Sequence, residues 1–287
     1  MKDLTGRIVV VTGGSSGIGA AAAAQFAARG AEVVLVGRTP AKLARVARRI
    51  GARSGATPAT VRVDFTELDD VRRAAAELTT RYPRIDVLAN NAGLLVGLRH
   101  RTVDGFERTI QVNHLAPFLL TSLLWPSLRA AAEENGHARV ITTSSLAEAA
   151  GSVDPENLNG AGLPYSRWAT YASSKQANLL FTVAAAQRWA GTGVVPTCFH
   201  PGMVRSRFGE ASLSFMLGKL FMLPPSLGAR GLVHLATEDD GVNRPGEFFF
   251  WRWPVACSPR SRDPVLAAAL WDASAAAVGV SSAMSES

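Results

Sequence analysis

The side chains best suited to chemistry in this sequence are Tyr171 and Lys175, four residues apart in the segment YASSK. In a helix this spacing puts both side chains on one face. An ammonium group beside a phenol favours the phenolate, so we expect the pKa of Tyr171 to lie below its usual value of about 10. Such a phenol can exchange a proton with an alcohol or a carbonyl compound. The alternative is an ordinary pair of surface residues on a helix.

A glycine-rich turn near the start of the chain is suited to binding a phosphate group. The apolar run 7–11 leads into TGGSSGIG at 12–19, and an alanine-rich run that predicts a helix follows to about Arg29. Glycines let a backbone approach a phosphate closely, and a helix N-terminus offers free N–H groups. The pattern predicts a cradle for a dinucleotide diphosphate, the alternative being a plain connecting turn. The residues expected to form it are Gly13, Ser15, Ser16, Gly17, Ile18 and Gly19.

Composition favours one folded enzyme domain and excludes several other classes. The 287 residues are 47% hydrophobic and 18% charged, which argues against disorder. Cys198 and Cys257 lie far apart, and the five histidines are not paired at metal-binding spacing. We therefore predict neither a disulfide framework nor a metal site.

Charge and hydropathy indicate where the chain is located and which partners it has. No run of about 18 apolar residues occurs, and the first predicted strand starts almost at once, so we expect a cytoplasmic protein without a signal peptide or transmembrane segment. The net charge is +7, and basic residues cluster between Arg38 and Arg53. Their helical spacing suits a solvated face without interleaved aromatic residues, so we do not expect a nucleic-acid partner.

Strand and helix patterns alternate along the chain, which predicts an α/β fold with a parallel sheet and right-handed crossovers. The tail beyond about Ala273 is rich in alanine and serine, and we expect it to fray. Further strands are expected at 32–36, 60–64, 86–89, 138–143 and 194–199, with helices at 40–50, 67–80, 104–132 and around Tyr171.

Several motifs occur together and in order, and their combination resembles the short-chain dehydrogenases/reductases over about residues 5–250. They are TGxxxGxG at 12–19, NNAG at 90–93, Asn113, Ser145, YxxxK at 171–175 and PG at 201–202. The segments SSLA at 144–147 and HPG at 200–202 are similar to the retinol dehydrogenase-like branch. The resemblance implies one Rossmann-type doubly wound domain over 1–287, with a mostly parallel seven-stranded sheet and a C-terminal extension at 251–287.

The resemblance also implies a role for each member of a catalytic set. Tyr171 would give a proton to a carbonyl group or take one from an alcohol, and Lys175 would lower its pKa and bind the nicotinamide ribose. Ser145, favoured over Ser144, would hold the substrate oxygen, and Asn113 would anchor a water that links Lys175 to solvent. The alternatives are that Ser145 is a cap and Asn113 a polar helix residue.

The end of the second predicted strand indicates which cofactor is used. An acidic residue there would bind a free adenosine ribose, whereas this chain has Gly37, Arg38 and Thr39. We predict NADP(H), with Arg38 and Thr39 at its 2′-phosphate and Lys42 as a weaker candidate; Arg38 could instead be merely exposed. The other residues expected at the cofactor are Asp64, Phe65, Asn91, Ala92, Gly93, Tyr171, Lys175, Pro201, Gly202, Val204 and Ser206.

The segment 203–230 stands where this family places a substrate lid, and its first part, 203–223, is strongly apolar. A lid of this kind suits a small lipophilic alcohol, aldehyde or ketone. An ordinary core helix, a contact in a homo-oligomer and a peripheral contact with a membrane surface stay open for the same segment.

These features together predict an NADP(H)-dependent oxidoreductase that interconverts a lipophilic alcohol and its carbonyl compound. The alternative is a regulator or scaffold that binds NADP(H) without turnover. The presence of Asn113, Ser145, Tyr171 and Lys175 in one chain favours the enzyme, because a sensor needs none of the four.

Overall fold

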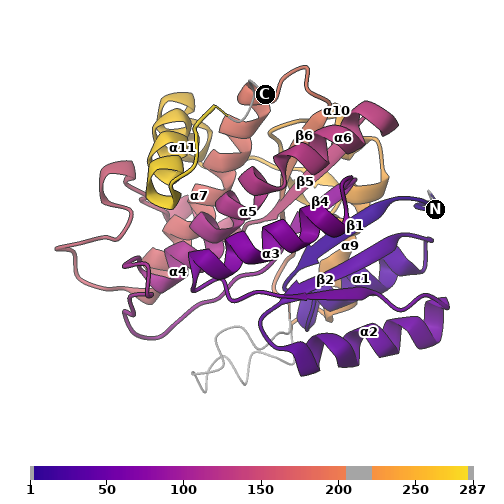
Figure 1. Cartoon of the computed structure of the whole chain (residues 1–287). Coiled ribbons are helices and arrows are strands. Elements are labelled where there is room, and N and C mark those ends of the chain that lie inside the picture. Colours follow the sequence, from indigo (N-terminus) through magenta and orange to yellow (C-terminus); the bar gives the residue numbers. More distant parts are fainter. Residues whose placement is uncertain (1–2, 205–221, 284–287) are drawn as a thin grey trace.

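Runs of valine, leucine and isoleucine form a central sheet that helices cover on both faces, as Figure 1 shows. The computed structural model describes residues 3–204 and 222–283. The strands are β1 (Ile8–Thr12), β2 (Glu32–Gly37), β3 (Ala59–Arg62), β4 (Val87–Asn90), β5 (Ala138–Thr143), β6 (Val194–His200), β7 (Phe248–Phe250) and β8 (Trp253–Pro254).

Strands β1 to β7 pair in parallel, in the order β3-β2-β1-β4-β5-β6-β7. The order reverses between β1 and β4, and in such sheets ligands bind at this switch point, beyond the carboxyl ends of the strands. The expected seven parallel strands are present, and β8 adds an eighth, antiparallel strand beside β7. A strand of two residues is too short to show a periodic pattern in the sequence.

Alternation along the strands divides the core into two layers. Val10, Val34 and Leu88 face one layer, and their neighbours Val9 and Leu35 face the other. Burial on both faces explains why these strands are continuously apolar. The first layer includes α3 (Leu68–Arg81), α5 (Ala116–Leu123), α6 (Trp125–Asn135), α7 (Arg167–Arg188) and α11 (Pro264–Val278), and the second α1 (Gly17–Ala27), α2 (Pro40–Ser54) and α9 (Pro225–Thr237).

The long helix expected at 104–132 is in fact broken. It consists of α4 (Arg108–Ile110), the π-helix η1 (Gln111–Leu115), α5 and α6. The axes of 108–123 and 125–135 differ by 58°. Pro126 stands in the first turn of α6, where it lacks the N–H that a continuous helix needs. The remaining elements among the described residues are the 3₁₀-helices η2 (Leu146–Ala150), η3 (Pro155–Asn157) and η5 (Pro259–Arg262), and the short helix α10 (Asp240–Asn243).

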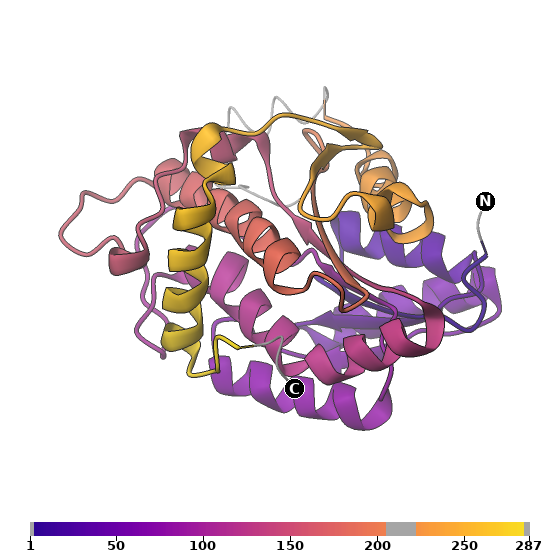
Figure 2. The ribbon, with the colours of Figure 1, turned by 90° about the horizontal axis from the view of Figure 1, so that it is seen from above.

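The expectation that the tail frays from about Ala273 is wrong, because α11 continues to Val278. Trp271, Ser274 and Val278 are buried, and α11 lies beside α7 in Figures 1 and 2. Asp272 on α11 also forms an ion pair with Arg188 on α7, at 3.0 Å. The part of the tail that belongs to α11, up to Val278, is therefore ordered by tertiary contacts.

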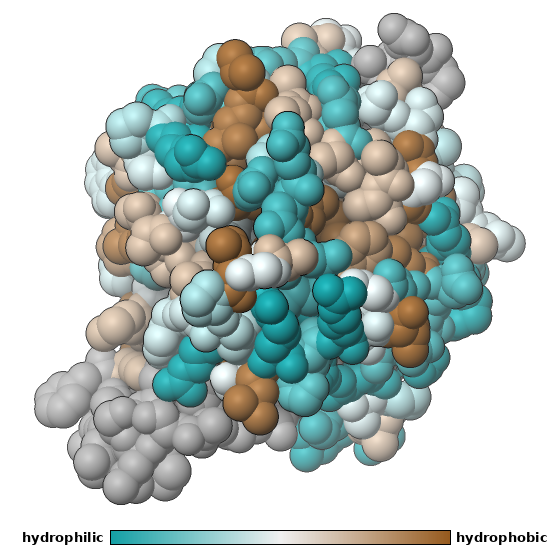
Figure 3. All heavy atoms as spheres, turned by 90° about the vertical axis from the view of Figure 1, so that its left-hand side faces the viewer, coloured by the Kyte–Doolittle hydropathy of each residue, from teal (hydrophilic) through white to brown (hydrophobic). Residues whose placement is uncertain are grey.

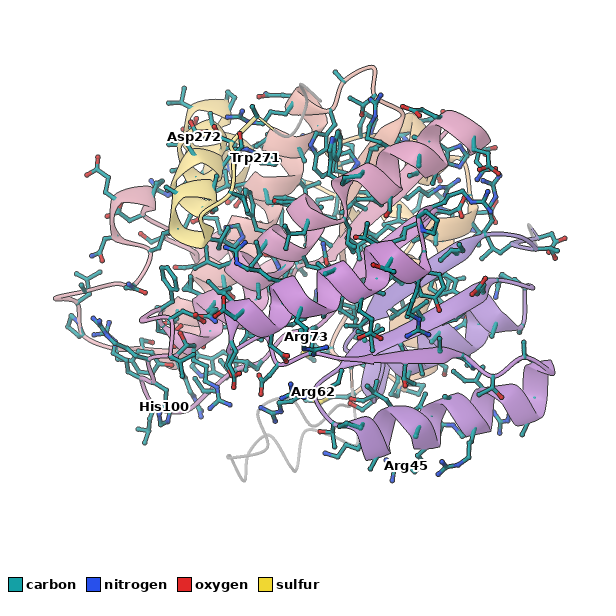
Figure 4. All side chains as sticks on the ribbon, viewed as in Figure 1. Arg45, Arg62, Arg73, His100, Trp271 and Asp272 are labelled. Carbon is teal, nitrogen blue, oxygen red and sulfur yellow. The ribbon has the colours of Figure 1, made fainter. Side chains whose placement is uncertain are left out.

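The outer surface is mixed in character. Arg45 on α2 points outward (Figure 4), and Arg48, Arg49 and Arg53 on the same helix are also exposed. On the face shown in Figure 3, apolar side chains form separate groups among hydrophilic ones.

Among the described helices, none is long and apolar enough to cross a membrane alone. One bent pair of helices, 108–123 and 125–135, meets the length and composition criteria when the two are taken together. A cytoplasmic location stays a prediction.

Candidate active site

Helix α7 carries Tyr171 and Lys175 along the carboxyl ends of the central strands. Lys175 is buried, and its Nζ donates a hydrogen bond of 2.9 Å to the carbonyl oxygen of Thr143, the last residue of β5. Asn178, one turn further along α7, donates to the same oxygen at 3.1 Å. Burial lowers the pKa of Lys175 to about 8. The end of β5 and the middle of α7 are thus tied together.

The Tyr171 phenol interacts with Ser145. Burial raises the pKa of Tyr171 to about 12, and the hydrogen bond between its side chain and that of Ser145 lowers it in part. The expectation that Lys175 brings this pKa below about 10 is therefore not met in this structure, because desolvation of the phenolate outweighs the favourable contacts. At this pKa the phenol carries its proton at neutral pH, which suits a proton donor.

The structure separates the two adjacent serines that follow β5. Ser144 is buried, and its hydroxyl donates to the backbone oxygen of Lys175 at 2.7 Å. Ser145 is half-buried, caps η2 by accepting from the N–H of Ala147 at 3.2 Å, and interacts with Tyr171. Ser144 thus fastens α7 to β5, while Ser145 faces the phenol. The cap alternative holds alongside this contact.

Asn113 lies in the π-helix η1, a type of irregularity that is frequent at functional sites. It is buried, and its side-chain amide accepts from the N–H of Leu94 at 2.8 Å. It donates to the oxygen of Leu94 and to the Ser174 hydroxyl, both at 3.0 Å. A Cβ built on Gly93 would lie 3.3 Å from Asn113 Oδ1 and 3.6 Å from Lys175 Nζ, so these two side chains flank the same backbone position.

The turn between β1 and α1 depends on its glycines. Gly13 has a φ of +68°, and a Cβ on Gly19 would lie 2.6 Å from the oxygen of Gly13 and 2.7 Å from Asn91 Nδ2. No described side chain caps the N-terminus of α1 at Ser16. Its first N–H groups are therefore free to bind an anion, so the residues fit the diphosphate of a dinucleotide.

A cavity of about 480 Å³ opens at the switch point of the sheet, at the start of α1. It brings together most of the residues that the sequence predicted for the cofactor. The predicted residues that line it are Gly13, Ser15, Ser16, Gly17, Ile18, Arg38, Thr39, Asp64, Phe65, Asn91, Ala92 and Gly93.

Arg38 and Thr39 stand at the rim of this cavity, directly after β2, and Lys42 lines it from α2. The Arg38 side chain is 59% exposed, and its Nε lies 3.9 Å from an oxygen of Asp64. Asp64 also accepts hydrogen bonds from the N–H and hydroxyl of Thr66, at 3.0 and 2.8 Å. The guanidinium is thus held only weakly and remains accessible to a phosphate group.

A second group of predicted residues follows β6. Pro201 is buried, Gly202 has a φ of +81°, and Val204 forms a bridge with Leu223. They do not line the 480 Å³ cavity as it stands. Ser206 and most of the expected lid, 205–221, lie outside the described residues.

One important contact of the cradle was missed in the sequence. The hydroxyl of Thr12 accepts from the N–H groups of Asn91 and Ala92, at 2.9 and 3.0 Å, and donates to the oxygen of Ala89 at 3.1 Å. It therefore ties the end of β1 to the turn after β4. A threonine between the apolar run and the glycines was the available signal. Cavity residues that were also not predicted are Gly37, Val63, Thr66, Leu94, Leu95 and Val112.

Sequence comparison identifies the family. The family model described as "short chain dehydrogenase" matches residues 7–215. The chain belongs to this family of oxidoreductases, which act on alcohol or carbonyl groups and use a nicotinamide dinucleotide.

Two curated relatives match nearly the whole chain. A Streptomyces sp. (strain C5) protein named "Putative daunorubicin C-13 ketoreductase DnrU" is 43% identical, covering 96% of this chain and 94% of the relative. Retinol dehydrogenase 13 of Mus musculus is 36% identical, covering 98% and 86%. The likeness to retinol dehydrogenases is thus confirmed.

Solved structures agree with the fold. An uncharacterized protein from Mycobacterium paratuberculosis superposes with a TM-score of 0.80 at 33% identity, covering 98% of this chain and 96% of that one. A protein described as a "putative short chain dehydrogenase", from Shigella flexneri 2a str. 301 and complexed with NADP, has a TM-score of 0.70 at 26% identity, covering 88% of this chain and 100% of that one.

Proposed function

We propose that this protein is an NADP(H)-dependent oxidoreductase that interconverts a lipophilic alcohol and its aldehyde or ketone. The observation that carries the proposal is the placement of Tyr171, Lys175, Ser145 and Asn113 around the carboxyl ends of β4 and β5. The dinucleotide-sized cavity opens at the same edge of the sheet. This arrangement supports a reaction in which these side chains act beside a bound cofactor.

Each side chain has a separate task in this reaction. When bound, the cofactor supplies or accepts the hydride. The Tyr171 phenol delivers the proton to the carbonyl oxygen in reduction, and in oxidation its phenolate takes the proton from the alcohol. The Ser145 hydroxyl donates to the same oxygen and stabilises its developing negative charge. Lys175, whose Nζ is held by Thr143, places a cation near the phenol and would bind the ribose of the cofactor.

Preference for the phosphorylated cofactor is supported by charge at the adenosine end of the cavity. Arg38 and Lys42 line this region. A guanidinium can pair with a phosphate through charge-assisted hydrogen bonds. Asp64 also lines the cavity, but Arg38 lies close enough to offset part of its charge. The NADP complex of the Shigella flexneri relative agrees with this proposal.

A lipophilic substrate is supported by exposed apolar side chains that adjoin the site residues in the chain. Leu146, next to Ser145, is 55% exposed, and Trp168, one turn before Tyr171, is 51% exposed. Met203, after Gly202, is 70% exposed. Large apolar side chains exposed beside a catalytic set favour an apolar ligand, because burial of their surface stabilises the complex. The ketoreductase and retinol dehydrogenase names of the relatives agree with such substrates.

The main alternative is an NADP(H)-binding regulator or scaffold without turnover. The two are separated by following NADPH absorbance with a panel of lipophilic aldehydes and ketones, using the wild type and a Tyr171→Phe variant. An enzyme consumes NADPH, and the variant loses turnover by about 10²–10⁴-fold while binding NADPH equally well. A regulator binds NADPH in both proteins and consumes it in neither.

A further inference from the structure

Glu148 is a buried carboxylate with partners far away in the sequence. Its side chain is 2% exposed and lies in η2, just beyond Ser145. It accepts hydrogen bonds from the N–H and the hydroxyl of Ser258, at 3.0 and 2.8 Å, and from the hydroxyl of Ser261. These partners lie at η5, more than one hundred residues later. We call Glu148, Ser258 and Ser261 the Glu148 clamp.

A single turn connects the clamp to Ser145. The N–H of Glu148 donates to the backbone oxygen of Ser145 at 3.0 Å, and the N–H of Ala147 donates to its hydroxyl at 3.2 Å. The position of Glu148 therefore determines where this turn lies and in which direction Ser145 projects. The same Ser145 hydroxyl interacts with the Tyr171 phenol.

The other end of the clamp is fixed to the helix that carries Tyr171. Helix α7 contacts both η2 and η5, and α11, which follows η5, packs along it. Arg260 in η5 also donates to the oxygen of Val153 at 3.1 Å, and Val153 N–H donates to Gln176 of α7 at 2.9 Å. The C-terminal extension thus connects α7 to the turn that contains Ser145.

The Glu148 clamp is more than a local cap. A buried carboxylate is costly unless several donors satisfy it, and here three donors come from one distant segment. Loss of the carboxylate leaves those donors without their acceptor and frees η2 to shift. Displacements on the order of 1 Å at a reacting centre slow catalysis by about 10²-fold.

We propose that Glu148 is a positioning residue, which acts through the first turn of η2 to hold the Ser145 hydroxyl against the Tyr171 phenol and the substrate oxygen. This inference rests on the proposed function. It also gives the C-terminal extension a role in catalysis without contact with the substrate.

A double-mutant cycle tests the proposal, with kcat, KM, NADPH affinity and thermal midpoint measured for each full-length protein. The variants are Glu148→Ala, Glu148→Gln and Ser258→Ala, each alone and combined with Ser145→Ala. Glu156→Ala, which changes an exposed glutamate in η3, is the matched control. We expect Glu148→Ala to lower kcat by about 10-fold to 100-fold. NADPH affinity should stay within about twofold, and Glu148→Gln should recover part of the rate because it keeps one acceptor oxygen.

The decisive readout is the effect of each clamp variant in the Ser145→Ala background. If Glu148 acts through Ser145, Glu148→Ala and Ser258→Ala have little further effect on kcat there. Equal fold-losses in both backgrounds, or an unchanged kcat in the single variants, overturn the proposal. If Glu148→Ala does not fold, Ser258→Ala and Glu148→Gln decide by the same criterion. A Ser145→Ala protein with full turnover would instead overturn the proposed function of the site.

Discussion

The Lys175 Nζ lies 5.6 Å from the centre of the Tyr171 ring, one helical turn further along α7. It is buried, and its hydrogen bond goes to Thr143 at the end of β5. Burial lowers the pKa of Lys175 to about 8 and raises that of Tyr171 to about 12. The charged form of each group is therefore disfavoured by its surroundings in the protein without cofactor.

The burial of Lys175 predicts that this residue lowers the stability of the fold, although the proposed reaction needs it. Its folded pKa lies below the unfolded value, so the unfolded chain binds more protons between about pH 8 and 10.5, and stability rises with pH there. We expect Lys175→Met to raise the free energy of unfolding at pH 7 by about 2–4 kcal/mol and to abolish the rise with pH. Thr143 keeps a donor in Asn178. Urea unfolding at several pH values, with turnover measured in parallel, tests this; a destabilised variant contradicts it.

Cofactor preference should change at Arg38. With Arg38→Glu we expect kcat/KM for NADPH to fall by about 10-fold to 100-fold, because a charge-assisted hydrogen bond to phosphate is lost and a like charge is added. The value for NADH should hold or rise. Steady-state kinetics with both cofactors measure the change, and Arg45→Glu, an exposed position on α2, is the control. Equal losses for the two cofactors would speak against a phosphate contact.

The close packing of the cradle makes Gly19 intolerant of a side chain. Its Cβ would lie 2.6 Å from a backbone oxygen, which cannot move without displacing the turn. We expect Gly19→Ala to lose at least about tenfold in NADPH affinity and to melt at a lower temperature. Gly97→Ala is the matched control, since nothing lies within 4 Å of a Cβ there. Calorimetric titration with NADPH and thermal melts compare them; similar behaviour of the two variants would refute this packing argument.

Two buried histidines should make the fold sensitive to acid. Burial lowers the pKa of His114 to about 4, and burial together with the Lys175 charge does the same for His200. The unfolded chain then binds more protons between about pH 4 and 6.5, so stability is lost as the pH falls through this range. We expect His114→Gln to remove about 2 kcal/mol of that loss. Denaturation at pH 7 and pH 4.5 checks it, and an unchanged pH dependence would show that His114 is not the group responsible.

The sequence contained enough information for the strands and for the residues of the candidate site, because these depend on local patterns. Apolar runs predicted β1 and β5, and short motifs marked Tyr171 and the glycine turn. The break before α6 was missed although Pro126 signals it, because the apolar pattern continues across the proline. The partners of Glu148 could not be foreseen, since the contact joins η2 to η5 through the tertiary fold. The raised pKa of Tyr171 likewise reflects burial, which the spacing of two residues does not reveal.

The C-terminal tail shows that local composition can also predict disorder where tertiary contacts produce a helix. Alanine and serine beyond Ala273 indicated a frayed end when considered alone. In the structure the Ser274 hydroxyl lies 2.8 Å from His114 Nε2, and Trp271 stacks on Phe181 of α7. Contacts with residues that are distant in the sequence, 160 positions away for His114 and Ser274, decide its structure, and local composition does not encode them.

The most direct test of the central claim is a crystal structure of the protein with NADP and a lipophilic alcohol or ketone bound. We predict the Tyr171 phenol and the Ser145 hydroxyl within about 2.6–3.2 Å of the ligand oxygen, with the reacting carbon facing the nicotinamide ring. A ligand oxygen bound away from Tyr171, with the phenol directed to solvent, would contradict the account.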